Sequence, residues 1–162
     1  MAVLKGLLWL LLGGAAALLA AGQLGALRGQ APGDLGVRDG RLKPPSKTPN
    51  SVSSQADLWP GHPQLEYARI APLAPRGDAA ATIARLKVIV ERWPGASLVT
   101  AAPDYLYVRF ETRALKFVDD AEFWFDPAAQ AVQVRSASRI GRKDFGVNRA
   151  RVEAIRAQMA QG

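Results

Sequence analysis

The chain contains no cysteine and a single histidine, His62, among its 162 residues. Without a thiol it cannot use a cysteine nucleophile, an iron–sulfur cluster or cysteine-ligated zinc. The absence of disulfides fits one domain of about a hundred residues, which buries about 60% of its unfolded surface and folds without cross-links or metals. His62 stands between Gly61 and Pro63 in a loop-like stretch. The sequence also lacks a GxSxG elbow, a phosphate-binding Walker loop, a dinucleotide fingerprint and internal repeats, so a serine hydrolase or nucleotide enzyme is disfavoured.

Positive charge is concentrated at the C-terminal end. The formal net charge is +7; residues 29–134 carry twelve Lys or Arg against twelve Asp or Glu, whereas residues 135–162 carry seven against two, an excess of +5. Such an excess suggests an acidic or phosphate-bearing partner, or a membrane surface. The alternative is a solvated helix face with no partner.

Residues 1–28 predict a signal peptide or a single transmembrane anchor. Gly6 to Leu27 is apolar apart from Gln23 and follows Lys5, the layout of a targeting segment. Its length reaches the roughly 20 residues needed to span a bilayer, yet small residues around Ala20 to Gly22 would also suit cleavage. Either way, we expect an inner-membrane protein with a periplasmic domain, or a free periplasmic protein. Nucleic acid is therefore not the expected partner of the basic end.

Residues 29–63 predict a linker, and residues 64–162 an α+β domain. Gly29 to Pro63 is rich in Gly, Pro, Ser and Asn and shows no apolar periodicity, which indicates an extended tether or a loop wrapped on the domain. The alternation of Leu65 to Ala71 predicts the first strand of the domain. Asp78 is a good N-cap for a helix that Pro94-Gly95 ends.

Four further strands and a last helix follow, at Ala96–Ala102, Tyr105–Thr112, Phe117–Phe125, Ala131–Ser138 and Val147–Ala160. The short connections between strands predict an antiparallel meander. The order β-α-β-β-β-β-α is typical of a two-layer α+β domain with an antiparallel sheet and two helices on one face. The other face is expected to be either open to solvent or covered by the segment Leu42–Pro63. It would carry Tyr105, Tyr107, Arg109, Glu122 and Trp124.

The acidic cluster consists of Asp119, Asp120 and Glu122. Asp120 and Glu122 share a strand face, roughly 7 Å apart. They could serve as a general acid/base pair or bind a hard cation. The competing interpretation, which we favour, is a cross-strand ion pair with Arg135 on the next strand. We therefore predict no metal and no cofactor.

The candidate ligand site is the strand-to-helix region that holds most of the excess positive charge. Backbone N–H groups near Gly141 and at the helix N-terminus, with flanking arginines, would suit a phosphate, sulfate or carboxylate. In the structural alternative, Asp144 caps the helix, Gly146 supplies a tight turn, and Asn148 and Arg149 hold the loop. The candidate residues are Arg135, Ser136, Ser138, Arg139, Gly141, Asp144, Asn148 and Arg149.

Three segments together resemble the bacterial and plastid family called domain of unknown function 1499: Leu42 to Gln55, Phe117 to Phe123, and Val134 to Arg151. The resemblance implies a fold and an envelope location but no activity. It also implies cysteines at the positions of Pro45 and Ser51, where this chain has none. We expect the motif loop, which contains Pro49, Asn50, Ser53 and Ser54, to be held by packing and by hydrogen bonds from Asn50, Ser53 and Ser54.

These observations favour a non-catalytic envelope protein that binds an anionic small molecule, a lipid headgroup or a protein partner through residues 135–151. The first alternative is an enzyme that uses Asp120 or Glu122 with Arg135. The second is a structural accessory subunit of a membrane complex, which an exposed apolar sheet face would favour.

Overall fold

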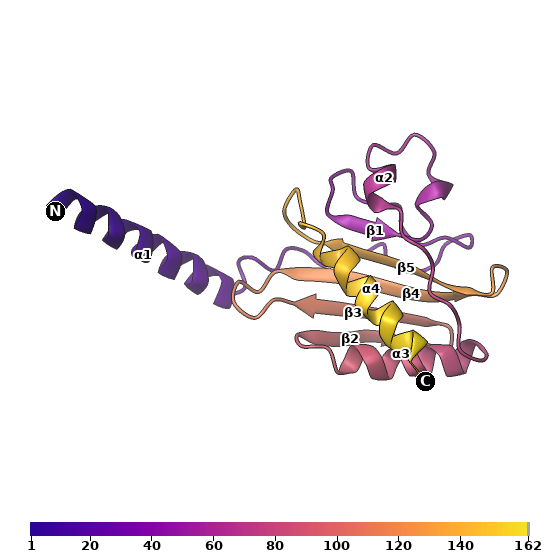
Figure 1. Ribbon diagram of the computed structural model, residues 1–162. Helices are drawn as coiled ribbons and strands as arrows, with labels where there is room; N and C mark the ends of the chain where they lie inside the picture. The colour runs from indigo at the N-terminus through magenta and orange to yellow at the C-terminus, as the bar shows by residue number, and fades with distance from the viewer. Residues whose placement is uncertain (162) are drawn as a thin grey trace.

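Five antiparallel strands form one sheet in the order β1-β5-β4-β3-β2 (Figure 1). The computed structural model describes residues 1–161. The strands are β1 (Ser51–Ser53), β2 (Ala96–Ala101), β3 (Tyr105–Glu111), β4 (Val118–Asp126) and β5 (Ala131–Ser138). The helices are α1 (Ala2–Gln23), the 3-10 turn η1 (Ala56–Leu58), α2 (Leu65–Ala68), α3 (Ala79–Glu91) and α4 (Val147–Ala160). The α+β class is confirmed, as is the antiparallel sheet.

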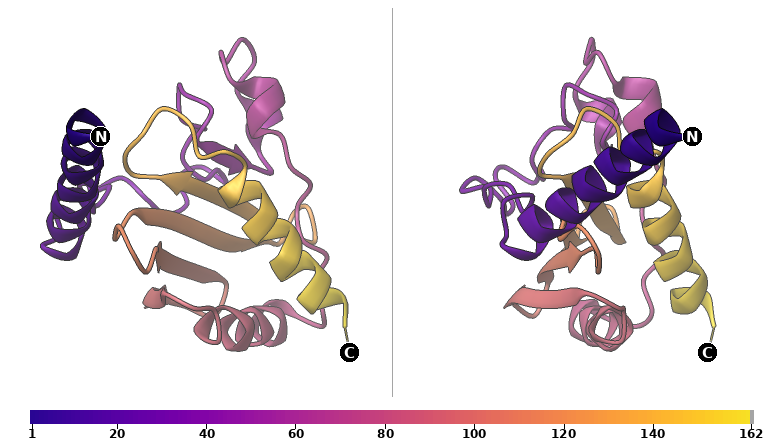
Figure 2. Two further views of the ribbon diagram at one scale, coloured as in Figure 1. Left: turned by 60° about the vertical axis from the view of Figure 1, so that its left-hand side comes forward. Right: turned by 90° about the vertical axis from the view of Figure 1, so that its left-hand side faces the viewer.

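Helices α3 and α4 cover one face of the sheet, as the sequence predicts (Figure 2). Their buried faces meet alternate residues of the strands in a single core. Because side chains of a strand alternate between faces, Leu106, Val108 and Phe110 of β3 all point into this core. The predicted cap is confirmed, since the Asp78 side chain accepts a hydrogen bond from the Ala81 N–H at 2.8 Å.

The predicted strand at Leu65–Ala71 is wrong. Leu65–Ala68 forms the short helix α2, and the first strand of the sheet is instead Ser51–Ser53, which pairs with β5. A short apolar alternation cannot by itself distinguish strand from helix, and Leu, Glu and Ala are good helix formers. Arg69 and Leu73 keep only isolated bridges, to Ser53 and Val132 respectively.

The segment expected as a linker is packed on the domain. Part of it is β1, and the part before it crosses the sheet face opposite the helices. There the Gly36 N–H donates to the Glu122 carboxylate at 2.7 Å, and the Pro44 carbonyl accepts from Arg135 at 3.2 Å. Of the two states expected for this face, open or covered, the covered one is observed, although the covering residues precede Leu42 as well as follow it.

Helix α1 projects from one end of the domain and is long and apolar enough to cross a membrane (Figure 1). Its last turn contacts the connection between β3 and β4. The Gln23 amide donates to the Arg113 and Ala114 carbonyls at 3.2 and 2.7 Å. A Cβ atom added to Gly22 would lie 2.7 Å from the Leu115 carbonyl oxygen, so this helix approaches the hairpin as closely as only glycine permits.

Candidate functional site

Each member of the acidic cluster pairs with a different arginine, and the three pairs do not share one site. Asp119 lies on the helix side of the sheet, whereas Asp120 and Glu122 lie on the covered side, as the strand alternation predicts. The three ion pairs are Asp119 with Arg151 at 2.6 Å, Asp120 with Arg139 at 2.8 Å, and Glu122 with Arg135 at 3.8 Å. This geometry matches the ion-pair interpretation. Within residues 1–161, no group of three or more His, Asp or Glu side chains is placed to hold a metal ion.

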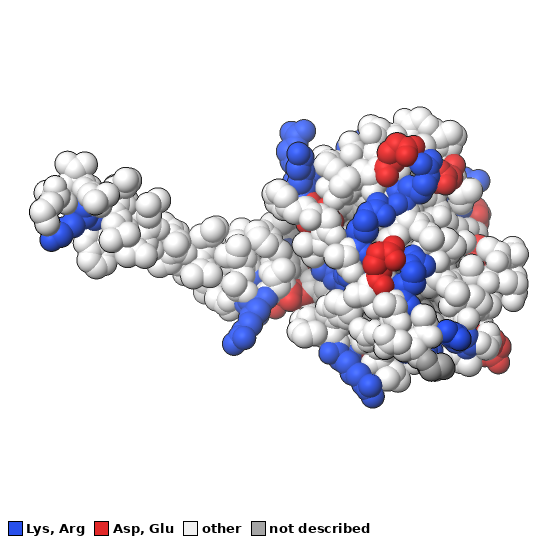
Figure 3. All heavy atoms as spheres, in the orientation of Figure 1, with Lys and Arg blue, Asp and Glu red and all other residues white. Residues whose placement is uncertain are grey.

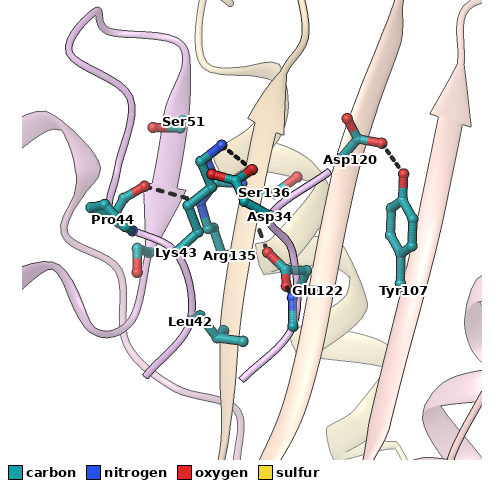
Figure 4. Close-up of polar contacts among 12 residues, drawn as sticks. Asp34, Leu42, Lys43, Pro44, Ser51, Tyr107, Asp120, Glu122, Arg135 and Ser136 are labelled. Carbon is teal, nitrogen blue, oxygen red and sulfur yellow. Dashed lines mark hydrogen bonds and ion pairs between the residues drawn. The ribbon is translucent and has the colours of Figure 1, made fainter. Parts of the chain in front are cut away.

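Asp120 has both carboxylate oxygens occupied. The Arg139 guanidinium donates to each of them at 2.8 Å, in the bidentate arrangement that makes arginine–carboxylate pairs strong. The Tyr107 hydroxyl donates to Oδ1 at 2.6 Å (Figure 4). Burial and the neighbouring carboxylate raise the pKa of Tyr107 to about 12, so it remains a donor. Asp120 therefore has no free oxygen with which to act on a substrate.

Glu122 is fully buried, and among residues 1–161 hydrogen-bond donors reach only one of its two carboxylate oxygens (Figure 4). Its Oε1 accepts from the Gly36 N–H at 2.7 Å and from the Tyr105 hydroxyl at 2.9 Å. Its Oε2 has no hydrogen-bond donor among residues 1–161. Burial raises the pKa of Glu122, against the lowering effect of its two donors and of Arg135.

Arg135 is the cross-strand partner of Glu122, but the two side chains do not form a hydrogen bond. The guanidinium Nε donates to the Pro44 carbonyl at 3.2 Å, and Nη1 stays 3.8 Å from Oε2 of Glu122. Only 5% of the Arg135 side chain is exposed. Burial lowers its pKa, a shift that the nearby carboxylates oppose. A desolvated cation is thus left without a close charged hydrogen-bond partner, which is costly.

A cavity of about 320 Å³ opens beside Arg135, between the covering segment and the sheet. Three cations and one carboxylate line it, and the carboxylate, Asp120, is already bound by Arg139. The remaining lining is mostly proline, serine and backbone. The lining residues are Gln30, Pro32, Lys43, Pro44, Pro45, Ser46, Asp120, Arg135, Ala137, Ser138 and Arg139.

The structure divides the predicted ligand residues into two groups on opposite sides of the sheet. Arg135 and Arg139 line the cavity, whereas Ser136 and Asn148 are bonded to each other at 2.5 Å on the helix side. Ser138 also lines the cavity, but its hydroxyl accepts from the Asn148 amide at 3.1 Å and so belongs with the helix-side group. Since Ser136 and Asn148 are buried there, they cannot reach the same ligand as Arg135.

The N-terminus of α4 is occupied by Asp144. Its carboxylate accepts from the Gly146 and Asn148 N–H groups at 3.1 and 3.0 Å and from the Tyr67 hydroxyl. Burial raises its pKa, but the donors from Tyr67, Asn148 and Gly146 together hold it below the usual value. Arg149 donates to the Tyr67 carbonyl at 2.6 Å. These contacts match the structural alternative, in which Asp144 caps the helix.

Hydrogen bonds hold the family-motif loop to β5 and to the loop after it, and one further bond lies within the motif region itself. The Asn50 amide donates to the Gly141 carbonyl at 2.8 Å, and the Pro49 carbonyl accepts from the Asp144 N–H at 3.3 Å. Ser54 donates to the Gln133 side chain at 2.7 Å, and the Ser53 hydroxyl accepts from the Gln55 N–H at 3.1 Å. The hydrogen bonds expected for this loop are therefore present.

Of the two positions where the resemblance implies cysteine, Pro45 and Ser51, only Ser51 makes a side-chain hydrogen bond among residues 1–161. Its hydroxyl accepts from the Ser46 N–H at 2.8 Å, which closes the loop between them.

Sequence reasoning missed the residues of the covering segment that contact Glu122 or line the cavity. Gly36, Lys43 and Pro44 come from a stretch without apolar periodicity, so nothing in the pattern predicts which sheet residue each would contact. The only signal was the proline and glycine content of this stretch. It indicated irregular backbone but not where that backbone lies on the sheet.

The fold and site define a small α+β protein with a five-stranded antiparallel sheet, an N-terminal apolar helix and a polar, covered sheet face. The family model described as Protein of unknown function (DUF1499) matches residues 41–159, and the chain belongs to this family. The matched range includes β1 and all of the sheet. Comparison with curated proteins and with solved structures found no match.

Proposed function

We propose that this protein is a membrane-anchored, non-catalytic binding module whose ligand is a small anion held in the Arg135 cavity. The observation that carries the proposal is the position of Arg135: a nearly buried guanidinium at the wall of a 320 Å³ cavity, 3.8 Å from Glu122, its one ion-pair partner among residues 1–161. A phosphate or carboxylate there would supply the charge-assisted hydrogen bonds that Arg135 lacks. Lys43 and Arg139 would add attraction from the other walls.

The satisfied state of the carboxylates supports binding over catalysis. Asp120 is held by Arg139 and Tyr107, and Glu122 lies beneath Gly36. A general acid or base must reach the proton that it transfers within hydrogen-bond distance. Neither carboxylate has an oxygen directed to open space in this arrangement, so the enzyme alternative has less support.

The contacts at the end of α1 support a retained anchor. Gly22 and Gln23, which lie at the sites where a leader would be cut, pack on the β3–β4 connection. Arg28 continues the contact with an ion pair to Glu111 at 2.9 Å. Cleavage would remove the first part of this interface. With the anchor retained, the domain would lie on the periplasmic side of an inner membrane, as the targeting segment implies.

The test is titration of the full-length chain in detergent with inorganic phosphate and, in parallel, with acetate, by calorimetry at constant ionic strength. Glu122→Gln keeps an acceptor for Gly36 and Tyr105 and removes the competing charge, so we expect tighter binding. The double variant Glu122→Gln with Arg135→Gln should bind each anion at least about tenfold more weakly than Glu122→Gln alone. The reason is that a hydrogen bond to a charged group contributes about 1.5–3 kcal/mol.

The control is Arg92→Gln, which removes one exposed positive charge remote from the cavity. It should bind as the unmodified chain does. If the folded double variant bound phosphate and acetate as tightly as the unmodified chain, the cavity would not be the site and we would abandon the proposal. Native mass spectrometry of the chain purified from its own membrane would identify a retained natural anion and show whether residues 1–28 are present.

A further inference from the structure

Two connections lie at the end of the sheet from which α1 projects. One is the turn between β3 and β4, on which the last turn of α1 packs. The other is the loop between β5 and α4, because the end of β5 lies beside the start of β4: Ser138 is the register partner of Asp119. Figure 1 shows this second loop extending from the same end of the domain as α1.

The chain leaving α1 also passes against the base of that loop. A Cβ atom added to Gly29 would lie 2.7 Å from the Ile140 side chain and 2.8 Å from the Arg139 Cβ. Arg139 is held in turn by its N–H bond to the Val118 carbonyl at 3.0 Å. The loop is thus fixed within a few residues of the point where the apolar helix ends.

The tip of the loop, residues 141–147, exposes an aromatic ring next to two cations. Phe145 is 92% exposed, and Val147 is 48% exposed. Arg142 and Lys143 are exposed and form no ion pair within residues 1–161. The other five cations of the basic C-terminal end each donate to a carboxylate or a carbonyl: Arg135, Arg139, Arg149, Arg151 and Arg156.

The backbone at the exposed ring has an unusual conformation. Phe145 has φ 53°, a left-handed conformation that non-glycine residues adopt at a cost. Asp144 fixes the residues on either side, through Gly146 and Asn148. The fold therefore keeps Phe145 at the tip of the loop, although this costs backbone strain and exposes an aromatic ring to water.

An aromatic side chain flanked by Lys and Arg suits the interface of an anionic bilayer. A phenylalanine ring buries at the boundary between headgroups and acyl chains, and each nearby cation adds about 1 kcal/mol of attraction to anionic lipid. The loop lies at the end of the domain where α1 would leave the hydrocarbon. Figure 3 shows basic side chains around the junction of helix and domain.

We propose that residues 141–147 form a second membrane contact, in which Phe145 enters the interface and Arg142 and Lys143 bind anionic headgroups. The contact would fix the orientation of the domain relative to the bilayer, with the anchor and the loop as two points of attachment. It rests on the retained anchor proposed above but is independent of anion binding in the Arg135 cavity.

Site-directed spin labelling of the full chain tests this directly, since the absence of native cysteine makes each label unique. A nitroxide at Val147→Cys reports the tip with Phe145 intact, and one at Ala128→Cys, an exposed residue in the turn between β4 and β5, is the matched control. The chain is reconstituted in nanodiscs of phosphatidylcholine alone and of phosphatidylcholine mixed with phosphatidylglycerol, whose negative headgroups make the surface anionic. Power saturation with oxygen and with a water-soluble nickel complex measures immersion.

We expect the label at 147 to be shielded from nickel in the anionic discs, and the label at 128 to be fully accessible in both. Phe145→Ser should abolish the shielding. The double variant Arg142→Ser with Lys143→Ser should lower the ratio of docked to undocked loops about thirtyfold, because the loss of each cation lowers it about fivefold. Equal nickel access at 147 and 128 in the anionic discs would overturn the proposal. Failure of the anchor is seen separately, as a chain that does not co-elute with the discs or has lost the mass of residues 1–28.

Discussion

Glu122 on β4 and Arg135 on β5 are direct cross-strand partners, yet their nearest charged atoms lie 3.8 Å apart. The reason is that Arg135 turns toward the Pro44 carbonyl, while Glu122 receives its hydrogen bonds from Gly36 and Tyr105 on its other oxygen. The covering segment thus separates a pair that the sheet register brings together. In the proposed function, this separation is what would allow Arg135 to bind another anion.

The first prediction concerns the pH dependence of stability. The raised pKa of Glu122 means that, from pH 4.5 up to that pKa, the folded protein holds a proton that the unfolded chain has released. Stability therefore falls as the pH rises through this window, by about 1.4 kcal/mol per unit of pKa difference. Glu122→Gln should remove the decline, as measured by urea unfolding at intervals from pH 4.5 to 8.

The exposed Glu91→Gln serves as the control for that measurement and should keep the decline of the unmodified chain. Asp144 does not interfere, because its lowered pKa acts with the opposite sign and only as the pH falls through and below 3.8. Parallel pH profiles for Glu122→Gln and the unmodified chain would show that Glu122 is not the buried proton acceptor.

The second prediction concerns the buried pair of Arg151 and Asp119. Arg151 donates to Asp119 at 2.6 Å and to the Asn148 side chain at 3.1 Å, and its guanidinium lies 4.5 Å from the centre of the Phe110 ring. Arg151→Met would leave Asp119 buried without a counter-charge and should lower the free energy of unfolding by about 3–5 kcal/mol. Chemical denaturation measures the loss.

Asp119→Leu in the Arg151→Met background should recover most of that loss, since two apolar side chains can replace a buried ion pair. This double variant is the control that separates charge burial from lost volume. If it were as unstable as Arg151→Met alone, packing of the Arg151 stem on Phe110 would be the main contribution of this residue.

The sequence predicts those parts of the fold that have a regular period or a recognisable cap. The strand Ala131–Ser138 and the helix Val147–Ala160 have the predicted bounds, and Asp78 caps α3. A short turn between neighbouring strands also predicted that Arg135 lies near Glu122 or Asp120, and the register places it opposite Glu122. Each of these depends only on local spacing.

The parts that were not predictable depend on contacts distant in sequence. Nothing in the local pattern distinguishes Ser51–Ser53 as an edge strand from Leu65–Ala71, because three residues carry no measurable period. The covered face depends on Gly36 and Pro44 lying over the sheet, 86 and 91 residues from their partners, and irregular backbone has no period to locate it. The sequence therefore predicted only the part of the lining that the sheet and its end contribute: Asp120, Arg135, Ser138 and Arg139.

The third prediction tests the junction between α1 and the domain. Gly22→Val should displace the last turn of α1, because its Cβ would overlap the Leu115 carbonyl at 2.7 Å. Hydrogen exchange of the full chain in nanodiscs should then show faster exchange at Lys116 and Phe117, the amides of this turn that are bonded within it. Gly13→Val is the matched control, because within residues 1–161 no atom other than those of its own helix or chain neighbours lies within 4 Å of its added Cβ. Equal exchange in both variants would show that the helix end is not seated on the hairpin.

The last prediction concerns Gly95, where α3 ends and β2 begins. Gly95 has φ 77°, and an added Cβ would lie 2.1 Å from the Glu111 carbonyl oxygen, while the Gly95 carbonyl accepts from the Glu111 N–H at 2.8 Å. Gly61 has nearly the same φ, 78°, but no atom of residues 1–161 beyond its chain neighbours lies within 4 Å of its added Cβ. Gly61→Ala should cost only the left-handed strain, about 1–2 kcal/mol, whereas Gly95→Ala should cost about 1–3 kcal/mol more.

Urea unfolding of the two alanine variants measures the difference at constant backbone strain. A clear excess for Gly95→Ala means that β2 is held in contact with β3 at this point, so that α3 cannot move away from the sheet without breaking the Gly95 to Glu111 bond. Equal costs would mean that the start of β2 can shift to admit a methyl group. The edge of the sheet would then be free to adjust, and the packing of α3 on the core, not the hairpin, would fix its position.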